Sequence, residues 1–264
     1  MIRSLEALKS YLFEAQDGDV GRVEDFYFDD QAWTVRYLVL ETGRWLPGRK
    51  FVVSPESIAS FDWRTEIIGL DLTRETIENS PRAEKHEPVS QQHLGELHSY
   101  YGWPAYWSIG PGALDSGIPI PRVGAENTDG VSEHEAPAEG ETETHLRSID
   151  EVLGYSIEAT DGSIGEVIDF GWDDQDWTIR YLVVDTRRWL PGKRVVLSPD
   201  WVSRVEWGAE RVHVDLPKKR IENSPPFDAR GAVNREYEEV LYDFYGRPKY
   251  WAEDSALGRQ ARST

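Results

Sequence analysis

Two short acidic segments are the first places where this sequence could do chemistry. They are Asp29-Asp30-Gln31 and Asp173-Asp174-Gln175-Asp176, and carboxylates at this density can coordinate a hard cation. The alternating Asp or Asn ligands, central Gly and distal Glu of an EF-hand loop are missing from both. The sequence therefore favours loops and turns here and predicts no metal site, with cation binding as the alternative.

The histidines and serines do not form a catalytic set. Only His93 and His98 share a short segment, and their spacing of five misses the i, i+4 geometry of helical zinc pairs. Ser54 and Ser198 each precede a proline and lie outside any G-x-S-x-G elbow. The Gly-Pro-Gly at 110–112 precedes no helix pattern, no Walker loop is present, and the chain has no cysteine. We expect a protein that is not an enzyme and holds no cofactor.

Arginines beside tryptophans are the best candidates for contacting a partner. Trp and Arg are enriched in binding hot spots, but an indole in a small β-protein can also fold back and cover its own core. The sequence favours this lid interpretation for the pairs that precede Leu-Pro-Gly and keeps partner binding open. The candidates are Arg44, Trp45, Arg188, Trp189 and the aromatic pairs Tyr106, Trp107, Tyr250 and Trp251.

The chain contains an internal repeat with an offset of 144 residues. "WTVRYLVLETGRWLPGRKFVVSP" at 33–55 aligns without a gap with "WTIRYLVVDTRRWLPGKRVVLSP" at 177–199, and "IENSP" recurs at 77–81 and 221–225. About 45 of about 105 aligned positions are identical. Because His93 and His98 align with Tyr237 and Tyr242, a catalytic role for these histidines would be confined to one copy.

Composition divides the chain into four parts. A segment rich in Gly, Pro and Glu separates the two copies, and it has too little apolar content to offset its chain entropy. We expect the first repeat with a trailing helix at 1–108, a flexible acidic linker at 109–145, the second repeat with its helix at 146–252, and a flexible tail at 253–264.

Within each copy, strand patterns come first and a helix pattern comes last. Asp17-Gly18 and Asp161-Gly162 predict tight hairpin turns. The alternation from Trp33 onwards predicts a strand that is apolar on both faces. About six short strands per copy indicate a small antiparallel barrel. Arg36 and Arg180 lie inside strands, where pairing with Asp25 and Asp169 is expected.

A short aromatic helix should close each copy. The patterns at 89–102 and 233–246 have helical spacing. Ser90 and Asn234 are plausible starts, and Gly102 and Gly246 plausible ends. Helices this short must dock on their own barrel, on the opposite copy in a pseudo-twofold pair, or on a second chain.

Charge and hydropathy limit the partners. A net charge of −19 disfavours nucleic acid and anionic membranes, because both require clustered basic residues. No apolar run approaches the ~18–20 residues that span a bilayer, and the first residues lack a targeting pattern. We therefore expect a cytoplasmic protein without an integral membrane segment.

The order of these motifs resembles the PRC-barrel family over about 3–80 and 147–224. The similar features are the Asp-Gly turn, the G-x-V-x-D strands at Gly21–Asp25 and Gly165–Asp169, the R-Y-L-V strands and the V-x-S-P or V-L-S-P steps. The resemblance implies two small antiparallel PRC-type barrels, mainly β with C-terminal helices, related by a pseudo-twofold axis.

In this family, the cytoplasmic domain of the photosynthetic reaction-centre H subunit and the C-terminal domain of a ribosome-maturation factor use the barrel to dock proteins. The resemblance therefore implies a non-enzymatic scaffold that binds a protein partner or associates with itself, including as a homodimer. The alternatives are an ancillary factor of photosynthetic or membrane electron-transfer complexes, and a small-ligand or metal binder between the repeats.

Overall fold

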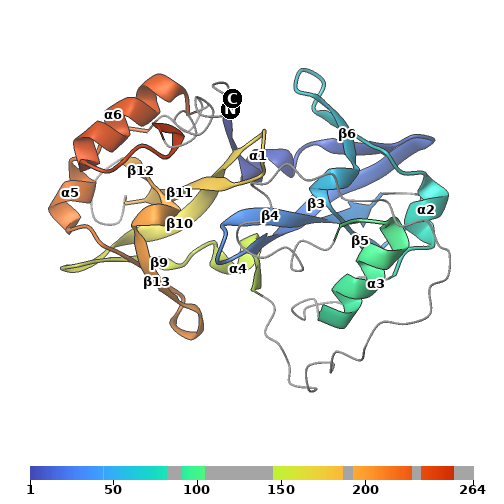
Figure 1. The fold of residues 1–264 in the computed structure, drawn as a ribbon, viewed down its shortest axis with the longest axis horizontal. Coiled ribbons are helices and arrows are strands. Elements are labelled where there is room, and N and C mark those ends of the chain that lie inside the picture. Colours follow the sequence, from blue (N-terminus) through green and yellow to red (C-terminus); the bar gives the residue numbers. More distant parts are fainter. Residues whose placement is uncertain (44, 82–90, 105–144, 187–192, 228–232, 253–264) are drawn as a thin grey trace, which may run out of the picture. The chain divides into compact units, whose positions relative to one another are not determined.

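A computed structural model of the 264-residue chain describes residues 1–43, 45–81, 91–104, 145–186, 193–227 and 233–252 (Figure 1). The chain divides into two compact units, one formed by residues 1–82 with 145–264 and the other by residues 83–144. The described helices include none that is both long and apolar enough to cross a membrane.

The first repeat builds a seven-stranded sheet that contains one strand from the second repeat. The strand order is β5-β4-β3-β2-β7-β6, with β8 paired to β3. Its strands are β2 (Leu12–Ala15), β3 (Gly18–Asp29), β4 (Thr34–Thr42), β5 (Lys50–Val53), β6 (Ile58–Asp62), β7 (Ile67–Leu70) and β8 (Leu146–Ser148). Short helices α1 (Leu5–Leu8), η1 (Pro55–Ser57) and α2 (Arg74–Glu78) connect or follow them.

The second repeat builds the same sheet with a strand from the first. The order is β12-β11-β10-β9-β14-β13, with β1 paired to β10. Its strands are β1 (Ile2–Ser4), β9 (Ser156–Ala159), β10 (Gly162–Asp173), β11 (Ile179–Asp185), β12 (Arg194–Leu197), β13 (Val202–Glu206) and β14 (Arg211–Val214). Its helices are α4 (Ile149–Val152), η3 (Pro199–Trp201), η4 (Trp207–Ala209), α5 (Lys218–Glu222) and α6 (Arg235–Tyr245).

The expected mainly-β architecture is confirmed, but two details differ. The β2–β7 and β9–β14 pairs are parallel, whereas the hairpin pattern predicted antiparallel strands throughout. Trp33 has a left-handed φ of 49° and ends a turn instead of beginning β4. In the described residues, no strand pair joins β5 to β6 or β12 to β13, so closure into barrels stays a prediction.

The Asp-Gly turns use both of their residues. Gly18 and Gly162 have φ values of 136° and 119°, which side chains other than glycine rarely adopt. The Asp17 carboxylate accepts the backbone N–H of Arg74 at 2.8 Å, and Asp161 accepts that of Lys218 at the same distance. Each turn thus binds the first residue of the short helix that follows the sheet.

The glycine that opens the G-x-V-x-D pattern permits close contact between strands. A Cβ on Gly21 would lie 1.9 Å from the Glu41 carbonyl oxygen, and one on Gly165 would lie 2.5 Å from that of Asp185. These clashes involve backbone atoms, which no side-chain rotation relieves. The glycines therefore allow β3 and β10 to approach the strands beside them.

Helix α6 lies against the sheet of its own repeat (Figure 1). The Asn234 side chain caps its start by accepting the N–H of Tyr237 at 2.9 Å, and Gly246 ends it with a φ of 63°. Both predicted boundaries are confirmed. Helix α6 also packs against η3, where the ring centroid of Trp201 lies 5.4 Å from that of Tyr242.

The corresponding helix of the first repeat is α3 (Gln91–Tyr101). Gly102 follows it with a φ of 73°, as expected for a helix end. Ser90, its predicted start, lies outside the described residues. Within this unit the rings of Tyr101 and Trp103 stack with centroids 4.3 Å apart.

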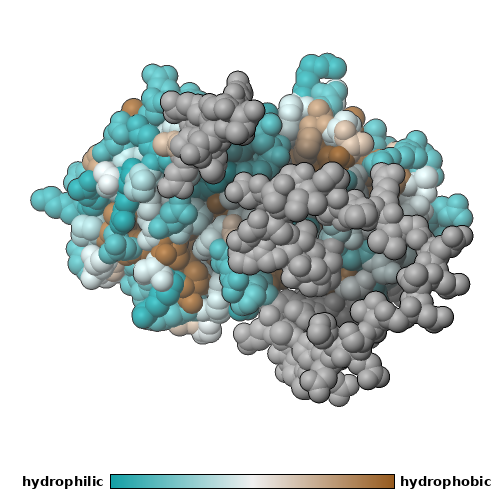
Figure 2. Space-filling view, viewed as in Figure 1, coloured by the Kyte–Doolittle hydropathy of each residue, from teal (hydrophilic) through white to brown (hydrophobic). Residues whose placement is uncertain are grey.

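Apolar side chains lie in the interior, and hydrophilic residues lie mainly on the surface. Large apolar side chains from both repeats form one buried cluster, including Phe28 and Phe170, whose ring centroids are 6.2 Å apart. On the face shown in Figure 2, hydrophilic residues cover most of the described surface.

Replacing Gly21 with alanine should destabilise the protein by about 3 kcal/mol, because the added methyl group overlaps a backbone carbonyl. Urea unfolding measures the change. Gly208→Ala is the matched control, since a Cβ there meets nothing within 4 Å. Equal stability of the two variants would contradict the close contact between β3 and β4.

Candidate functional site

The contact between the repeats is a reciprocal exchange of short strands. Strand β1 pairs with β10 through Ile2↔Asp173, Arg3↔Trp172 and Ser4↔Gly171. Strand β8 pairs with β3 through Leu146↔Asp29, Arg147↔Phe28 and Ser148↔Tyr27. The two ladders are equivalent, because each residue of β1 corresponds to the residue of β8 that lies 144 positions later, and each residue of β10 to the residue of β3 that lies 144 positions earlier. We call this two-sided contact the seam.

The two repeats also meet at Thr34 and Thr178. These two residues correspond to each other in the repeats and form an isolated antiparallel bridge. On either side of it, the Val35 N–H donates to the Trp177 carbonyl at 3.0 Å and the Ile179 N–H to that of Trp33 at 2.6 Å. The left-handed turns at the two tryptophans place these carbonyls at the seam.

Asp25 and Asp169, the last residues of the two G-x-V-x-D patterns, bind the exchanged segments. Asp25 accepts the Ser148 hydroxyl at 2.6 Å and the Asp150 N–H at 3.2 Å. Asp169 accepts the Ser4 hydroxyl at 2.6 Å and the Glu6 N–H at 3.2 Å. Each carboxylate therefore holds the start of a helix that belongs to the other repeat.

The pairing expected for Arg36 and Arg180 is wrong. Arg36 lies 3.6 Å from Asp29, and Arg180 lies 2.5 Å from Asp176 and 4.0 Å from Asp173. The arginines thus pair with the loop of their own repeat, because Asp25 and Asp169 are already engaged by the exchanged segments.

Burial raises the pKa of both seam carboxyls, Asp25 and Asp169, above the ordinary value for aspartate. The hydrogen bonds from Ser148 and Ser4 oppose this shift without cancelling it. The two groups are therefore easier to protonate in the folded chain than in the unfolded one.

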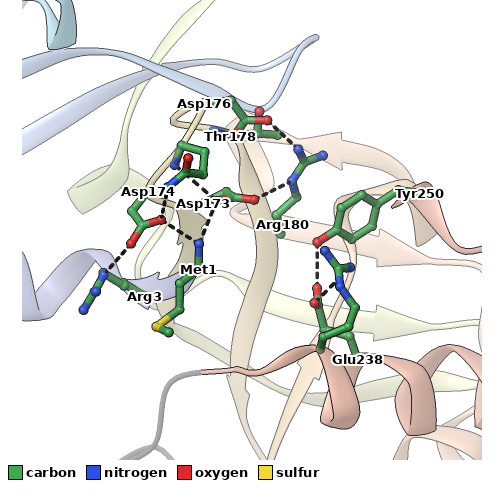
Figure 3. A network of polar contacts seen from close by, with 11 residues as sticks. Met1, Arg3, Asp173, Asp174, Asp176, Thr178, Arg180, Glu238 and Tyr250 are labelled. Carbon is green, nitrogen blue, oxygen red and sulfur yellow. Dashed lines mark hydrogen bonds and ion pairs between the residues drawn. The ribbon is translucent and has the colours of Figure 1, made fainter. Parts of the chain in front are cut away.

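The acidic loops hold the exchanged strands through ion pairs, and Figure 3 shows those made by the loop of the second repeat. Arg3 donates to Asp174 at 2.8 Å, and Arg147 donates to Asp30 at 3.3 Å. The Met1 amino group lies 2.6 Å from Asp174. Although burial alone would raise it, these hydrogen bonds lower the pKa of Asp174. Among the described residues, no three metal-binding side chains cluster as a metal site would require.

The same two arginines also lie over the ring of a tryptophan from their own repeat. The Arg3 guanidinium lies 3.6 Å from the ring centroid of Trp63, and that of Arg147 lies 4.4 Å from Trp207. A cation over an indole face is attracted by the ring quadrupole. Each arginine consequently contacts a tryptophan of its own repeat and an aspartate of the other.

Among the described residues, Glu238 on α6 is the most buried carboxylate, with 2% of its surface exposed. It accepts the hydroxyl of Tyr181 at 2.8 Å and that of Tyr250 at 2.7 Å, and Arg235 lies 3.1 Å away (Figure 3). Arg180 lies 4.4 Å from the centroid of the Tyr250 ring. The residue of the first repeat that corresponds to Glu238 is Leu94. The first repeat therefore has no carboxylate at this position.

Three of the eight candidate partner-binding residues are described. The Trp45 indole donates to the Val20 carbonyl at 2.8 Å, which places it over its own sheet as the lid interpretation expects. Tyr250 packs in the Glu238 cluster, and Trp251 lies half-buried with the Arg235 guanidinium 4.2 Å from its ring centroid. The others, Arg44, Tyr106, Trp107, Arg188 and Trp189, lie outside the described residues.

The serines and His98 have structural contacts. Ser54 and Ser198 each accept a backbone N–H at 3.3 Å and begin a short 3₁₀ helix. The His98 ring lies edge-on to Trp103 with centroids 5.5 Å apart, and burial lowers the pKa of His98.

A cavity of about 250 Å³ lies beside the exchanged strand β1 on the second sheet. Most of its walls are apolar, and its charged lining residues come from β1 and from β10, β11 and β12. Its lining includes Ile168, Gly171, Val183 and Arg194, with Asp169 and Asp185. None of the first four was identified from sequence. Aligning the two repeats position by position would have provided the signal, because three of them differ from their counterparts.

A comparison with models of known protein families finds no match, and a comparison with curated protein sequences finds no similar protein.

Acidification should stabilise the native protein relative to the Asp169→Asn variant. A carboxyl with a raised folded-state pKa holds its proton more tightly when folded. Its contribution to the free energy of unfolding therefore grows as pH falls from 7 towards the ordinary aspartate pKa of about 3.9. Urea unfolding of both proteins across this range measures the difference. Ser4→Ala, which removes an opposing hydrogen bond, should steepen the dependence; a flat or inverted difference would argue against burial of Asp169.

Replacing Glu238 with alanine should cost about 3 kcal/mol of stability, because the buried Tyr181 hydroxyl and its neighbours lose their acceptor. Glu238→Gln, which keeps an acceptor oxygen, should cost clearly less. Chemical unfolding of both variants provides the comparison. If glutamine and alanine were equally destabilising, the hydrogen bonds to Glu238 would contribute nothing.

Proposed function

We propose that the chain is a tandem PRC-barrel protein that acts as a non-enzymatic adaptor and binds a protein partner. The main observation behind this proposal is that the polar residues shared by both repeats form contacts between the repeats. Asp25 and Asp169, and the arginines Arg3 and Arg147, contact one another's repeats across the seam. The charged side chains that both repeats share therefore join the two halves of the protein, and they are not left free to act on a substrate.

The end of the second repeat offers a surface suited to a protein partner. Trp251 is half-buried, and Arg235 lies over its ring while Tyr242 contacts it edge-on at 5.1 Å. A tryptophan held in place by an arginine loses little side-chain entropy when it binds, which is typical of hot-spot residues. The net charge of −19 favours a basic or neutral partner.

The resemblance to the reaction-centre H subunit leaves a more specific version of the proposal. The partner would then be a component of a photosynthetic or other electron-transfer complex. Membrane-derived and soluble extracts of the source cells, used side by side in the experiment below, distinguish this version from a soluble partner.

The full chain, carrying an affinity tag, should retain one protein in near-stoichiometric amount from an extract of its source cells. Trp251→Ala should reduce the retained amount at least about tenfold, because truncating a hot-spot residue costs about 2 kcal/mol or more. Quantitative mass spectrometry measures the change. Arg64→Ala, an exposed residue of the first repeat, is the control and should retain the partner fully.

Analytical ultracentrifugation of the purified native chain and of the Trp251→Ala variant tests whether the partner is a second copy of the chain. The proposal is contradicted if the native chain sediments as a monomer and retains nothing that empty resin does not. It is also contradicted for this surface if Trp251→Ala retains the same partner equally well.

A further inference from the structure

Two residues that line the cavity beside β1 differ from their counterparts in the first repeat. Gly171 occupies the place of Tyr27, and a Cβ there would lie 3.1 Å from Ile2 Cγ2 and 3.3 Å from Tyr181 Cβ, so this wall lies close to the exchanged strand. Ile168 occupies the place of Glu24, which turns an acidic wall into an apolar one. Both substitutions lie on β10, next to the exchanged strand.

The replacement of Glu24 by Ile168 also removes the ion-pair partner that Arg194 would have at this position. In the first repeat, the Lys50 ammonium pairs with the Glu24 carboxylate. In the second repeat, Arg194 occupies the place of Lys50, and Ile168 has no charge to offer. Across the described part of the chain, no hydrogen bond or ion pair engages the half-buried Arg194 guanidinium.

The two carboxylates of the cavity do not replace Glu24. Asp169 already accepts the Ser4 hydroxyl and the N–H groups of Glu6 and Phe170. Asp185 faces Arg194 in the strand register, but the two side chains form no ion pair in the described part of the chain. The guanidinium at the cavity thus presents donors in a planar fork that matches a carboxylate.

We propose that this cavity binds a small monocarboxylic acid with an apolar body, whose carboxylate pairs with Arg194 as Glu24 pairs with Lys50. An apolar cavity of about 150 Å³ is large enough for benzene, so 250 Å³ holds a body of that size together with a carboxylate. The body would contact Ile168, Val183 and Val196. The inference is independent of the proposed adaptor function.

Titration calorimetry of the full chain with benzoate and with 4-methylpentanoate tests the proposal. We expect saturable binding at one site, while benzylamine, of similar size and opposite charge, should bind at least about tenfold more weakly. Arg194→Gln should weaken binding of both acids at least about tenfold. Lys50→Gln, the matched change in the first repeat, should leave it unchanged.

Ile168→Glu provides the second test, because it keeps Arg194 and restores the pair that the first repeat contains. It should abolish binding of the acids without lowering the temperature of unfolding. Failure of both acids to bind the native chain would overturn the proposal. Binding that persists in Arg194→Gln and Ile168→Glu, or that does not distinguish the acids from benzylamine, would overturn it as well.

Discussion

The structure depends on two half-buried aspartates that each hold a segment from the other repeat. Asp25 binds the start of α4 and Asp169 binds the start of α1, at positions related by the 144-residue offset. Because the exchanged strands β1 and β8 have only three residues each, their ladder hydrogen bonds alone would be weak. The carboxylates, the Arg–Asp pairs and the arginines over tryptophan rings fix these strands in register.

This arrangement explains why the repeated motif contains so many charged residues and still specifies a fold. In an isolated copy, Asp25 would lack the Ser148 hydroxyl and the Asp150 N–H that bind it in the tandem chain. In the tandem chain each such group meets its complement in the other copy. The second repeat has additional features, namely the Glu238 cluster and an Arg194 that has no ion pair among the described residues, and both lie at positions where the repeats differ in sequence.

Much of the local structure could be predicted from the sequence, because turns and helix ends depend on nearby residues. The Asp-Gly turns, Asn234 and Gly246 behave as their types indicate. The partner of Asp25 could not be predicted, since Ser148 lies 123 residues away. Alternation assigns residues to faces of a strand but does not say which strand pairs with which. Three-residue strands are also too short to show any period.

The reciprocal seam is tested most directly by joining the repeats at the bridge between Thr34 and Thr178. The chain has no native cysteine, so Thr34→Cys with Thr178→Cys introduces a single possible disulfide across the isolated bridge. A protease site inserted between residues 120 and 130 then allows the chain to be cut. We predict complete oxidation within one chain and fragments that separate only after reduction and unfolding. Free thiols, together with fragments that elute as independent halves, would contradict the seam.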